Sequence, residues 1–323
     1  MTTYPIKFEP ILQEKIWGGT KLKSLLNKKS TSDSIGESWE ISGVEGHISV
    51  VNNGVYKGCS ITDLIKNHKQ NFVGSKNYRQ FGNEFPLLIK YLDANTDLSV
   101  QVHPDDEMAQ AEHNSFGKTE MWYIMDREED ATIINGFKNE KVTTNSLRAI
   151  TKDNVDQILN KQKVNKGDAF FIPAGKVHAI RAGVLAAEIQ QTSDITYRVY
   201  DWDRVDTSGQ GRELHLEQSI KAVKRDEAAA NPSTENSSCS KSKVLASCPY
   251  FTSTVMDLNQ PTSVDYSSKD SFVIYMCVEG SFEIHINGSI EKVNKGETVL
   301  IPANAQKVFL DTQAAKVIEV YVE

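Results

Sequence analysis

Apolar and polar residues alternate with a period of two over much of the chain, a pattern that predicts β-strands as the main structural element. Two distant stretches share one pattern, since residues 164–173 read VNKGDAFFIP and residues 293–302 read VNKGETVLIP. In each copy a Lys-Gly turn precedes a strand that ends at an Ile-Pro pair. An Asn-Gly pair upstream of each copy, at 135–136 and 287–288, is typical of a hairpin turn. The repeat predicts two β-barrels of one type.

A smaller part of the chain has helical periodicity. The predicted helices cover 60–73, 105–114, 153–162 and 215–230, with Ser60 at the start of the first and Asp153 as the cap of the third. Segment 231–243 is rich in Ser and Asn and nearly free of apolar residues, which predicts a linker or mobile loop. We therefore expect a mainly β fold with a few peripheral helices, divided into an N-terminal domain over 1–230 and a C-terminal barrel over 244–323.

The two copies of the repeat differ at a candidate metal ligand. In the first copy Ile-Pro is followed by Ala-Gly-Lys-Val-His, which ends at His178. When the copies are aligned, Lys307 occupies this position in the second. We interpret the N-terminal barrel as the catalytic one and the C-terminal barrel as a degenerate, structural copy.

Further candidate ligands lie near the first copy. The period of two in LSVQVH places Gln101 and His103 on one face of a strand. Glu120 lies on a second strand, and His178 comes just past a Pro-Gly turn. Two imidazoles, a carboxylate and an amide oxygen, with one position open for water or substrate, form a catalytic zinc arrangement. The same ligands suit Fe(II) or Mn(II).

The candidate histidines, and also one lysine and two arginines, can be explained by purely structural roles. A lone histidine on a strand is more often a surface or core residue than a ligand, so the metal hypothesis depends on the joint placement of His103 and His178. Lys90 is an isolated charge in the apolar run PLLIKYL, which indicates either an edge residue that reaches water or a pocket cation. Arg198 and Arg204 flank an aromatic segment, where a structural Asp–Arg pair is the ordinary interpretation.

Composition narrows the classes of function. A chain of 323 residues is long enough for two packed units. Its net charge of −7 argues against nucleic acid or an anionic membrane as the partner, but not against a small anion bound by local cations. The 4 cysteines include no CxxC pair and indicate reduced thiols. No apolar run is long enough for a signal-peptide core or a spanning helix, so we expect a soluble, cytoplasmic protein.

Longer motifs resemble those of a known family, the type I mannose-6-phosphate isomerases, or phosphomannose isomerases, of the cupin superfamily, especially their short bacterial form. The motifs are FEPILQEKIWGGTKL (8–22), IGESWEISG (35–43), FPLLIKYLDANTDLSVQVHPDD (85–106), GKTEMWYIM (117–125), IPAGKVHAI (172–180) and AAEIQQTSDITYRVYDWDR (186–204). They span about the first two thirds of the chain, and the second barrel lies where the family places one.

The resemblance implies two cupin, or jelly-roll, barrels and an aldose–ketose isomerase that interconverts mannose 6-phosphate and fructose 6-phosphate through an enediol. It implies one Zn²⁺ per chain, with the ligands Gln101, His103, Glu120 and His178. It also implies that Arg198 is the catalytic arginine and that Ser99, Lys118 and Glu188 lie in the substrate pocket. The expected partner is a phosphosugar, bound by a monomer or a homodimer, with no nucleic acid and no membrane.

The sequence leaves the roles inside this pocket open. Glu188 is the best carboxylate candidate for the base, and Lys118 suits phosphate binding or proton transfer. The forked guanidinium of Arg198 can hold two oxygens of an enediolate or a phosphate, and we favour Lys90 as a further substrate-binding cation. The alternatives are an Fe(II) cupin dioxygenase that uses the same ligands and a non-catalytic sugar-phosphate sensor. Cations such as Lys118 and Arg198 argue for an anionic substrate and against the dioxygenase.

Overall fold

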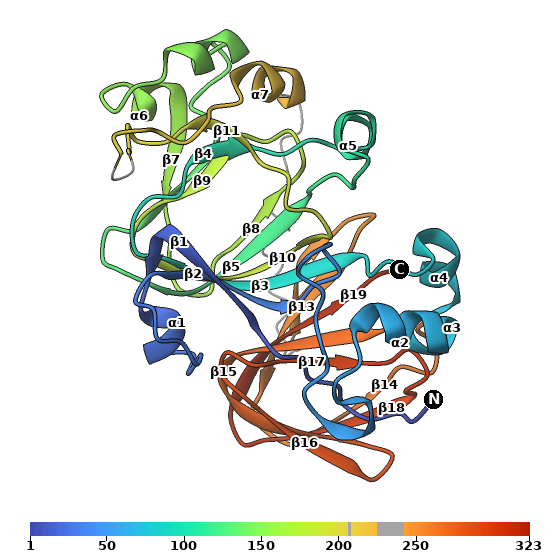
Figure 1. The fold of residues 1–323 in the computed structure, drawn as a ribbon. Coiled ribbons are helices and arrows are strands. Elements are labelled where there is room, and N and C mark those ends of the chain that lie inside the picture. The colour runs from blue at the N-terminus through green and yellow to red at the C-terminus, as the bar shows by residue number, and fades with distance from the viewer. Residues whose placement is uncertain (206–207, 225–241) are drawn as a thin grey trace.

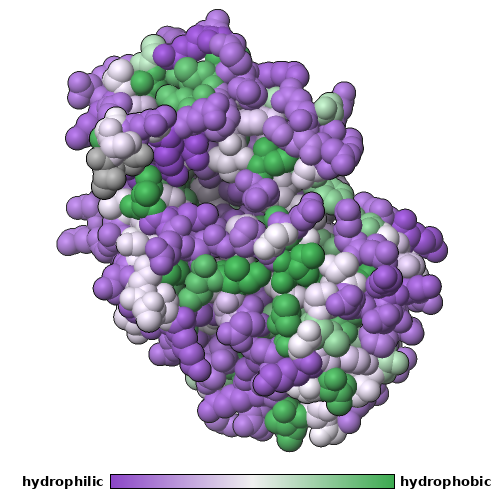
Figure 2. All heavy atoms as spheres, viewed as in Figure 1, coloured by the Kyte–Doolittle hydropathy of each residue, from purple (hydrophilic) through white to green (hydrophobic). Residues whose placement is uncertain are grey.

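The computed structural model describes residues 1–205, 208–224 and 242–323. Within them strands dominate and helices are short, which confirms the predicted mainly β class. Figure 1 shows two barrels, one above the other, with the helices at their periphery. Hydrophilic residues cover most of the face in Figure 2, because the strands bury their apolar sides inside the barrels and between them. No helix in the described residues is long and apolar enough to cross a bilayer.

The N-terminal barrel consists of two antiparallel sheets. The six-stranded sheet has the order β1 (Ile11–Gly19), β2 (Ile35–Ile41), β3 (Leu87–Ala94), β10 (Val184–Gln191), β5 (Glu120–Arg127) and β8 (Ala169–Ile172). The five-stranded sheet has the order β11 (Tyr197–Tyr200), β4 (Val100–Val102), β9 (His178–Ile180), β6 (Thr132–Phe137) and β7 (Leu159–Lys163). The two sheets face each other in the upper half of Figure 1.

The C-terminal barrel is one curled sheet. Its order is β12 (Ser242–Ser247), β13 (Thr252–Leu258), β19 (Ala315–Tyr321), β15 (Val273–Ile286), β18 (Lys307–Asp311) and β14 (Thr262–Asp265). Two further strands, β16 (Ser289–Asn294) and β17 (Thr298–Ile301), also pair with the long strand β15. The length of β15 lets one strand join both halves of the barrel.

The two barrels share an apolar core. One cluster of buried side chains includes Tyr91 and Ile189 from the six-stranded sheet together with Ile274 and Ile318 from the C-terminal sheet. Strands β3 and β10 are buried at all eight positions, because one face lines the N-terminal barrel and the other packs against the C-terminal barrel. The six-stranded sheet that carries part of the candidate site is therefore fixed from behind by the second barrel.

The helix prediction for 60–73 is right at its start and wrong in its length. Ser60 caps α2 (Ile61–His68) in a capping box with Asp63. At Lys69 the backbone has φ 50, and the chain continues as α3 (Gln70–Val73) and α4 (Ser75–Phe81). The positive φ at Lys69 and a second one at Gly74, with φ 95, interrupt the hydrogen bonds of a continuous helix, so three short helices form along the C-terminal barrel (Figure 1).

The other helix predictions have mixed outcomes. α5 (Asp106–His113) confirms the prediction for 105–114, with Asp105 as its N-cap. For 153–162 only α6 (Val155–Ile158) forms, since Leu159 begins strand β7, and Asp153 is not the cap. α7 (Leu216–Ala222) begins as predicted but ends early, because the backbone is extended at Val223. Residues 225–230 and the part 231–241 of the predicted linker lie outside the described residues. The remaining short helices are α1 (Lys21–Ser24), η1 (Gly54–Tyr56) and η2 (Thr144–Ala149).

The two Asn-Gly pairs have different structures. Asn287 and Gly288 form the predicted hairpin turn between β15 and β16, with φ 48 and 82, the two positive values of a type I′ turn. Asn135 and Gly136 instead lie inside β6, at a bulge where the pairing with β7 shifts register. The hairpin prediction for this first pair is wrong, because β6 continues past the glycine.

The structure also corrects the alignment of the two repeats. His178 and Ile180 face the interior of the N-terminal barrel, and Ile180 pairs with Ile133 of β6. In the C-terminal barrel the residues that face inward are Val308 and Leu310, while Lys307 is exposed. The structural counterpart of His178 is therefore Val308. The loop after Ile301-Pro302 is one residue longer than the loop after Ile172-Pro173. The absence of a ligand at that position is confirmed.

The shared core makes a stability prediction. Ile274→Ala removes a fully buried side chain between the barrels, so it is expected to lower the free energy of unfolding by about 2–5 kcal/mol in urea denaturation. Ile290→Ala is the matched control, because Ile290 is 59% exposed on the same barrel, and its expected effect is about 0.5 kcal/mol or less. Equal effects of the two substitutions would contradict a tightly packed interface.

Candidate active site

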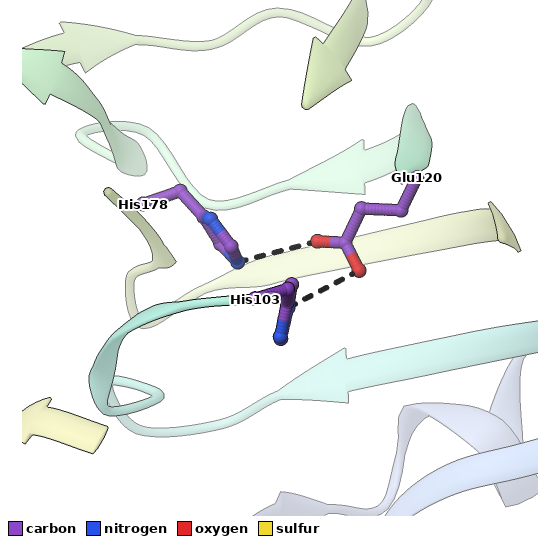
Figure 3. A group of neighbouring side chains, drawn as sticks. All are labelled: His103, Glu120 and His178. Atoms are coloured by element: carbon purple, nitrogen blue, oxygen red, sulfur yellow. Dashed lines mark ion pairs between the residues drawn. The ribbon is translucent and has the colours of Figure 1, made fainter. Parts of the chain in front are cut away.

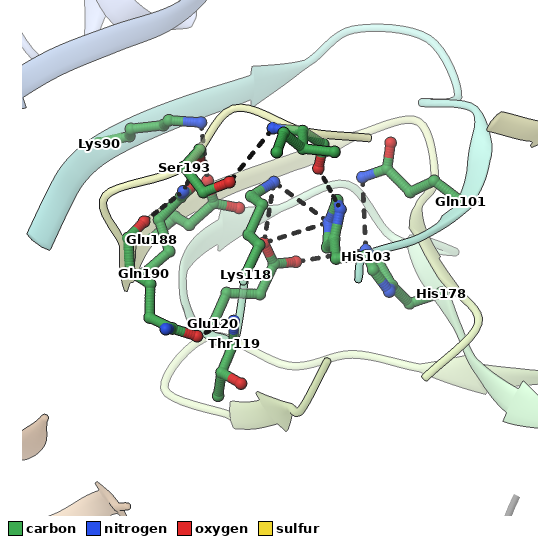
Figure 4. A network of polar contacts seen from close by, with 12 residues as sticks. Lys90, Gln101, His103, Lys118, Thr119, Glu120, His178, Glu188, Gln190 and Ser193 are labelled. Carbon is green, nitrogen blue, oxygen red and sulfur yellow. Dashed lines mark hydrogen bonds and ion pairs between the residues drawn. The ribbon is translucent and has the colours of Figure 1, made fainter. Parts of the chain in front are cut away.

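The five-stranded sheet carries one row of predicted site residues. Arg198 on β11 pairs with Gln101 on β4, and Gln101 pairs with His178 on β9. His103 lies two residues after Gln101, so its side chain projects from the same face of the sheet. The period-two prediction for this segment is confirmed, since both side chains approach His178 or its neighbours in Figure 4.

The six-stranded sheet carries a second row opposite the first. Lys90 on β3 pairs with Glu188 on β10, and Glu188 pairs with Trp122 on β5. Glu120 lies two residues before Trp122, at the start of β5, and so faces the same way. Figure 4 shows the side chains of the two rows pointing toward one another from opposite sheets. The candidate site is thus the space between the two sheets of the N-terminal barrel.

Three candidate metal ligands converge in this space (Figure 3). The Nε2 atom of His103 is 3.5 Å from Oε2 of Glu120, and the Nε2 atom of His178 is 3.3 Å from Oε1. The ligand atoms of the three residues all lie within 4.8 Å of one another. All three side chains are buried, with exposures of 1% or less. The prediction that these dispersed residues come together is confirmed.

The two imidazoles are oriented for metal binding. Nδ1 of His103 is 2.9 Å from the carbonyl oxygen of Ile195, and Nδ1 of His178 is 2.8 Å from that of Lys176. Because a carbonyl only accepts, each Nδ1 carries the proton and donates it. Nε2 is then left with a free lone pair that faces the centre of the site. This second hydrogen bond is the usual support of a metal-bound histidine.

The charge states of the three candidate ligands also favour metal binding. Burial, reinforced by the Lys118 ammonium, lowers the pKa of His103 to about 3, and burial also lowers the pKa of His178. Both imidazoles are therefore neutral at pH 7, which is the form that binds metal. Burial alone would raise the pKa of Glu120, but the Lys118 ammonium holds it well below its usual range. The site contains one ionised carboxylate between two neutral imidazoles.

This donor set fits a divalent cation. Both oxygens of Glu120 are buried and have no hydrogen-bond partner among the described residues, and the cation that balances their charge is Lys118, 3.2 Å from Oε2. Two imidazole nitrogens and one carboxylate are the protein ligands of many catalytic zinc sites, and Fe(II) or Mn(II) accept the same set. The residues present therefore suit a metal, and the choice among these metals is not fixed by the donor types.

Gln101 and Lys118 complete the surroundings of the ligand group. The Gln101 amide nitrogen is 3.4 Å from Nε2 of His178, and its oxygen accepts a hydrogen bond from Ser99 at 3.4 Å. A half-turn of the Gln101 amide would place its oxygen, in place of its nitrogen, next to Nε2 of His178. Nζ of Lys118 is 3.1 Å from Nε2 of His103 and 3.2 Å from Oε2 of Glu120. Lys118 is thus in direct contact with the ligand group.

Lys90 is a pocket cation and not an edge residue. It is 4% exposed, and its Nζ lies 3.2 Å from Oε1 of Glu188 and 3.6 Å from Oε2 of Glu37. Burial lowers the pKa of Lys90, but Glu37 and Glu188 raise it above its usual value, so it stays charged. Burial raises the pKa of Glu188, and Lys90 offsets part of this shift. Oε2 of Glu188 also accepts a hydrogen bond of 2.9 Å from the Trp122 indole.

The sequence left a structural Asp–Arg pair as the ordinary interpretation of Arg198 and Arg204, and among the described residues the structure contains such a pair for Arg204 only. Asp201 forms ion pairs with Arg204 and Arg212 and none with Arg198. Arg198 donates to the carbonyl oxygen of Glu213 at 2.8 Å, and its buried Nε has no partner among the described residues. Burial, together with the positive charge of Arg212, lowers the pKa of Arg198. Arg198 is therefore a cation without a carboxylate partner in the described part of the chain.

One cavity of about 280 Å³ connects these groups. The predicted residues that line it are Lys90, Ser99, Gln101, Lys118, Glu188 and Arg198. The structure adds Lys15, Glu37, Trp39, His47 and Arg212 to its walls. Sequence reasoning missed these, because Glu37 and Trp39 show only as alternating positions of a strand, and Arg212 lies in a segment without periodicity. Its walls include Gln101 and Lys118, which contact the metal-ligand group, and the two arginines Arg198 and Arg212.

Comparisons with known proteins match most of the length of the chain. The family model for the catalytic domain of type I phosphomannose isomerase matches residues 6–129, and the model for the mannose-6-phosphate isomerase cupin domain matches 241–322. The chain is 38% identical over 308 residues to mannose-6-phosphate isomerase ManA of Bacillus subtilis, covering 94% of each chain. It is 37% identical over 300 residues to mannose-6-phosphate isomerase of Streptococcus mutans, covering 92% of each.

The fold is shared as well. A crystal structure of the mannose 6-phosphate isomerase from Bacillus subtilis superposes with a TM-score of 0.86 at 32% identity and full coverage of both chains. This agreement extends over both barrels, including the shared core between them. On the strength of these matches along almost its whole length, the chain belongs to the family of type I mannose-6-phosphate isomerases and is an enzyme of that family.

Proposed function

We propose that the enzyme interconverts mannose 6-phosphate and fructose 6-phosphate through an enediol, with one Zn²⁺ per chain at His103, Glu120, His178 and Gln101. The observation that carries this proposal is the convergence of the three buried ligands beside the charged cavity. The names of the relatives support the substrate. We also propose that 1–230 is the catalytic domain and that the C-terminal barrel is structural. The barrel begins with β12 at Ser242, two residues earlier than the sequence predicted, so we propose that 231–241 joins the two domains.

The chemistry requires a base that moves a proton between C2 and C1 of the open-chain sugar. Glu188 is the proposed base, because burial raises its pKa toward the range in which a carboxylate exchanges protons at neutral pH. Lys90 and the Trp122 indole hold its two oxygens in place. In the forward direction Glu188 takes the proton from C2 and returns it to C1. A second proton passes from the O2 hydroxyl to the aldehyde oxygen O1, so that O2 becomes the ketone oxygen and O1 becomes the hydroxyl on C1.

The developing charge on O1 and O2 needs stabilisation. A zinc ion bound at the ligand group would supply a Lewis acid for these two oxygens. Lys118 contacts the same ligand group and is the proposed side chain that hydrogen-bonds the enediol and exchanges its hydroxyl proton. Ser99 and Gln101 present further polar atoms to the sugar from β4 and the residue before it.

We propose that the phosphate binds at the arginine end of the cavity. Each lysine on the cavity wall has a carboxylate partner, in the pairs Lys15–Glu37, Lys90–Glu188 and Lys118–Glu120. Arg198 has none in the described residues, and Arg212 lies beside it with one face of its guanidinium on Asp201. A dianionic phosphate would balance this excess charge, and the guanidinium geometry suits bidentate phosphate binding.

The spacing of the two ends matches a hexose phosphate. His178, Gln101 and Arg198 lie in one row on three neighbouring strands, so the ligand group and the arginine are two strand spacings apart, about 9–10 Å. Carbon 1 and the phosphate are at opposite ends of an open-chain hexose 6-phosphate. We therefore propose that C1 and C2 lie near Glu120 and that the phosphate lies near Arg198.

The first assay tests the reaction and the metal together. Purified protein is expected to form fructose 6-phosphate from mannose 6-phosphate, to lose this activity on chelation and to recover it with added zinc. The measurement is product formation in a coupled spectrophotometric assay. Recovery with Fe(II) and consumption of oxygen would indicate the dioxygenase instead, and fully zinc-loaded protein that binds the sugar without turnover would indicate the sensor.

A pair of histidine variants tests the ligand assignment. His178→Gln is expected to lose both zinc, measured by elemental analysis, and activity, because the substitution removes an imidazole ligand. His285→Gln, in the C-terminal barrel, is the matched control and should retain both. Arg198→Ala should keep zinc and lower kcat/KM by about 10–100-fold, because it removes a charged hydrogen-bond donor to the phosphate. Full zinc content and normal turnover in His178→Gln would show that the proposed site is wrong.

A pair of arginine variants tests the phosphate site. Arg212→Gln is expected to raise KM for mannose 6-phosphate by about 10–100-fold, because a hydrogen bond to a charged group is worth about 1.5–3 kcal/mol. Zinc content should not change. Arg204→Gln is the matched control, since Arg204 bonds the same Asp201 but does not line the cavity. If both variants raise KM equally, Arg212 only supports Asp201 and does not bind phosphate.

A further inference from the structure

The C-terminal barrel contributes one hydrogen bond to the surroundings of the candidate active site. Asp106, the first residue of α5, accepts hydrogen bonds from three segments of the chain. Its Oδ1 accepts from the backbone NH of Gly117 at 2.8 Å and from the Gln191 side chain at 2.9 Å. Its Oδ2 accepts from the hydroxyl of Tyr250 at 2.7 Å. Tyr250 lies between β12 and β13, so this bond joins the two barrels.

The bonds around Asp106 fix the backbone just before β5. The NH of Gly117 bonds Asp106, the NH of Lys118 bonds the carbonyl of Pro104 at 3.0 Å, and the NH of Thr119 bonds the Gln191 side chain at 2.8 Å. Three consecutive amides are therefore held by three partners from outside the strand. The next residue in the chain is the candidate ligand Glu120.

Close packing limits movement of this segment further. A Cβ atom on Gly117 would lie 2.6 Å from the backbone of Asp105 and Asp106, so the chain passes too close to α5 for any side chain. Gln191 bonds Asp106 with its nitrogen and Thr119 with its oxygen, and so it links β10 to the same segment. A shift of Asp106 would be transmitted to Lys118 and Glu120 through these short bonds.

The Tyr250 hydroxyl acts only as a donor in this arrangement. Burial, together with the neighbouring Asp106 carboxylate, raises the pKa of Tyr250, so the phenol keeps its proton at every physiological pH. The ring is partly buried against the core shared by the two barrels. Removal of the hydroxyl alone therefore tests the bond to Asp106 while it leaves the packing of the ring in place.

We propose that Tyr250 is a positioning residue, through which the C-terminal barrel fixes Asp106 and thereby the segment 117–120 that carries Lys118 and Glu120. The proposal rests on the proposed function at one point, the assignment of Lys118 and Glu120 to the reaction. It gives the second barrel, which lacks the metal ligands, a direct part in the geometry of the site.

Hydrogen exchange in the metal-free protein tests the proposal without reference to activity. Tyr250→Phe is expected to increase the exchange rate of amides 117–119 at least about 10-fold, since their support is loosened while the global fold remains. Tyr266→Phe is the matched control, because Tyr266 also bonds a carboxylate, Glu319, but both residues belong to the C-terminal barrel. Unchanged exchange of amides 117–119 in Tyr250→Phe, or equal changes in the two variants, would overturn the proposal.

Zinc affinity supplies a second readout, measured by competition with a chromophoric chelator. Tyr250→Phe is expected to weaken zinc binding by about 10-fold, the lower end of the effect of removing an outer partner of a metal ligand. Tyr266→Phe should leave zinc affinity unchanged even if it lowers the melting temperature. In an Asp106→Asn background, Tyr250→Phe should add little, because both changes break one network. A wild-type protein without isomerase activity would contradict the proposed function but would leave the exchange result intact.

Discussion

A single buried carboxylate, that of Glu120, is the constraint on which the site depends. An ionised carboxylate in a protein interior costs several kcal/mol unless neighbouring groups compensate for the lost hydration. Here both oxygens are buried, and the cation beside them is Lys118, 3.2 Å from Oε2. The neutral imidazoles of His103 and His178 come from the five-stranded sheet, opposite the six-stranded sheet that carries Glu120, and turn their Nε2 atoms toward the carboxylate. The face-to-face packing of the two sheets therefore buries the carboxylate and brings the three candidate ligands together.

Other buried charges along the cavity are paired as well. Lys90 lies between Glu37 and Glu188, and the Trp122 indole holds the second oxygen of Glu188, so these buried charges are fixed before any ligand arrives. Preorganised charges of this kind stabilise a transition state without the cost of reorientation. Arg198 breaks the pattern, because it has no ion pair among the described residues and the nearby carboxylate of Asp201 binds Arg204 and Arg212. The cavity thus has one neutralised end and one cationic end.

In the second barrel, other residues occupy the positions that correspond to the candidate site. Tyr275 pairs with Glu319 there as Trp122 pairs with Glu188 in the first barrel, and Val308 replaces His178. Glu319 accepts a hydrogen bond from Tyr266, which also contacts the Tyr275 hydroxyl, so this interior polar group is satisfied by phenols and not by cations. The barrel contributes by packing against the six-stranded sheet and by the contact of Tyr250 with Asp106.

The sequence by itself determined the mainly β class, the two repeated barrels and the identity of the metal-ligand candidates, because strand alternation and turn residues are local properties. It also located the start of the helices that Ser60 and Asp105 cap, but not the cap of α6. Only the tertiary structure decided that Lys90 is buried in the pocket, that Asp201 binds Arg212 and not Arg198, and that Val308 is the counterpart of His178. These outcomes depend on which strands become neighbours and on one extra loop residue, and pairing between distant strands is set by packing over the whole barrel, which no local pattern encodes.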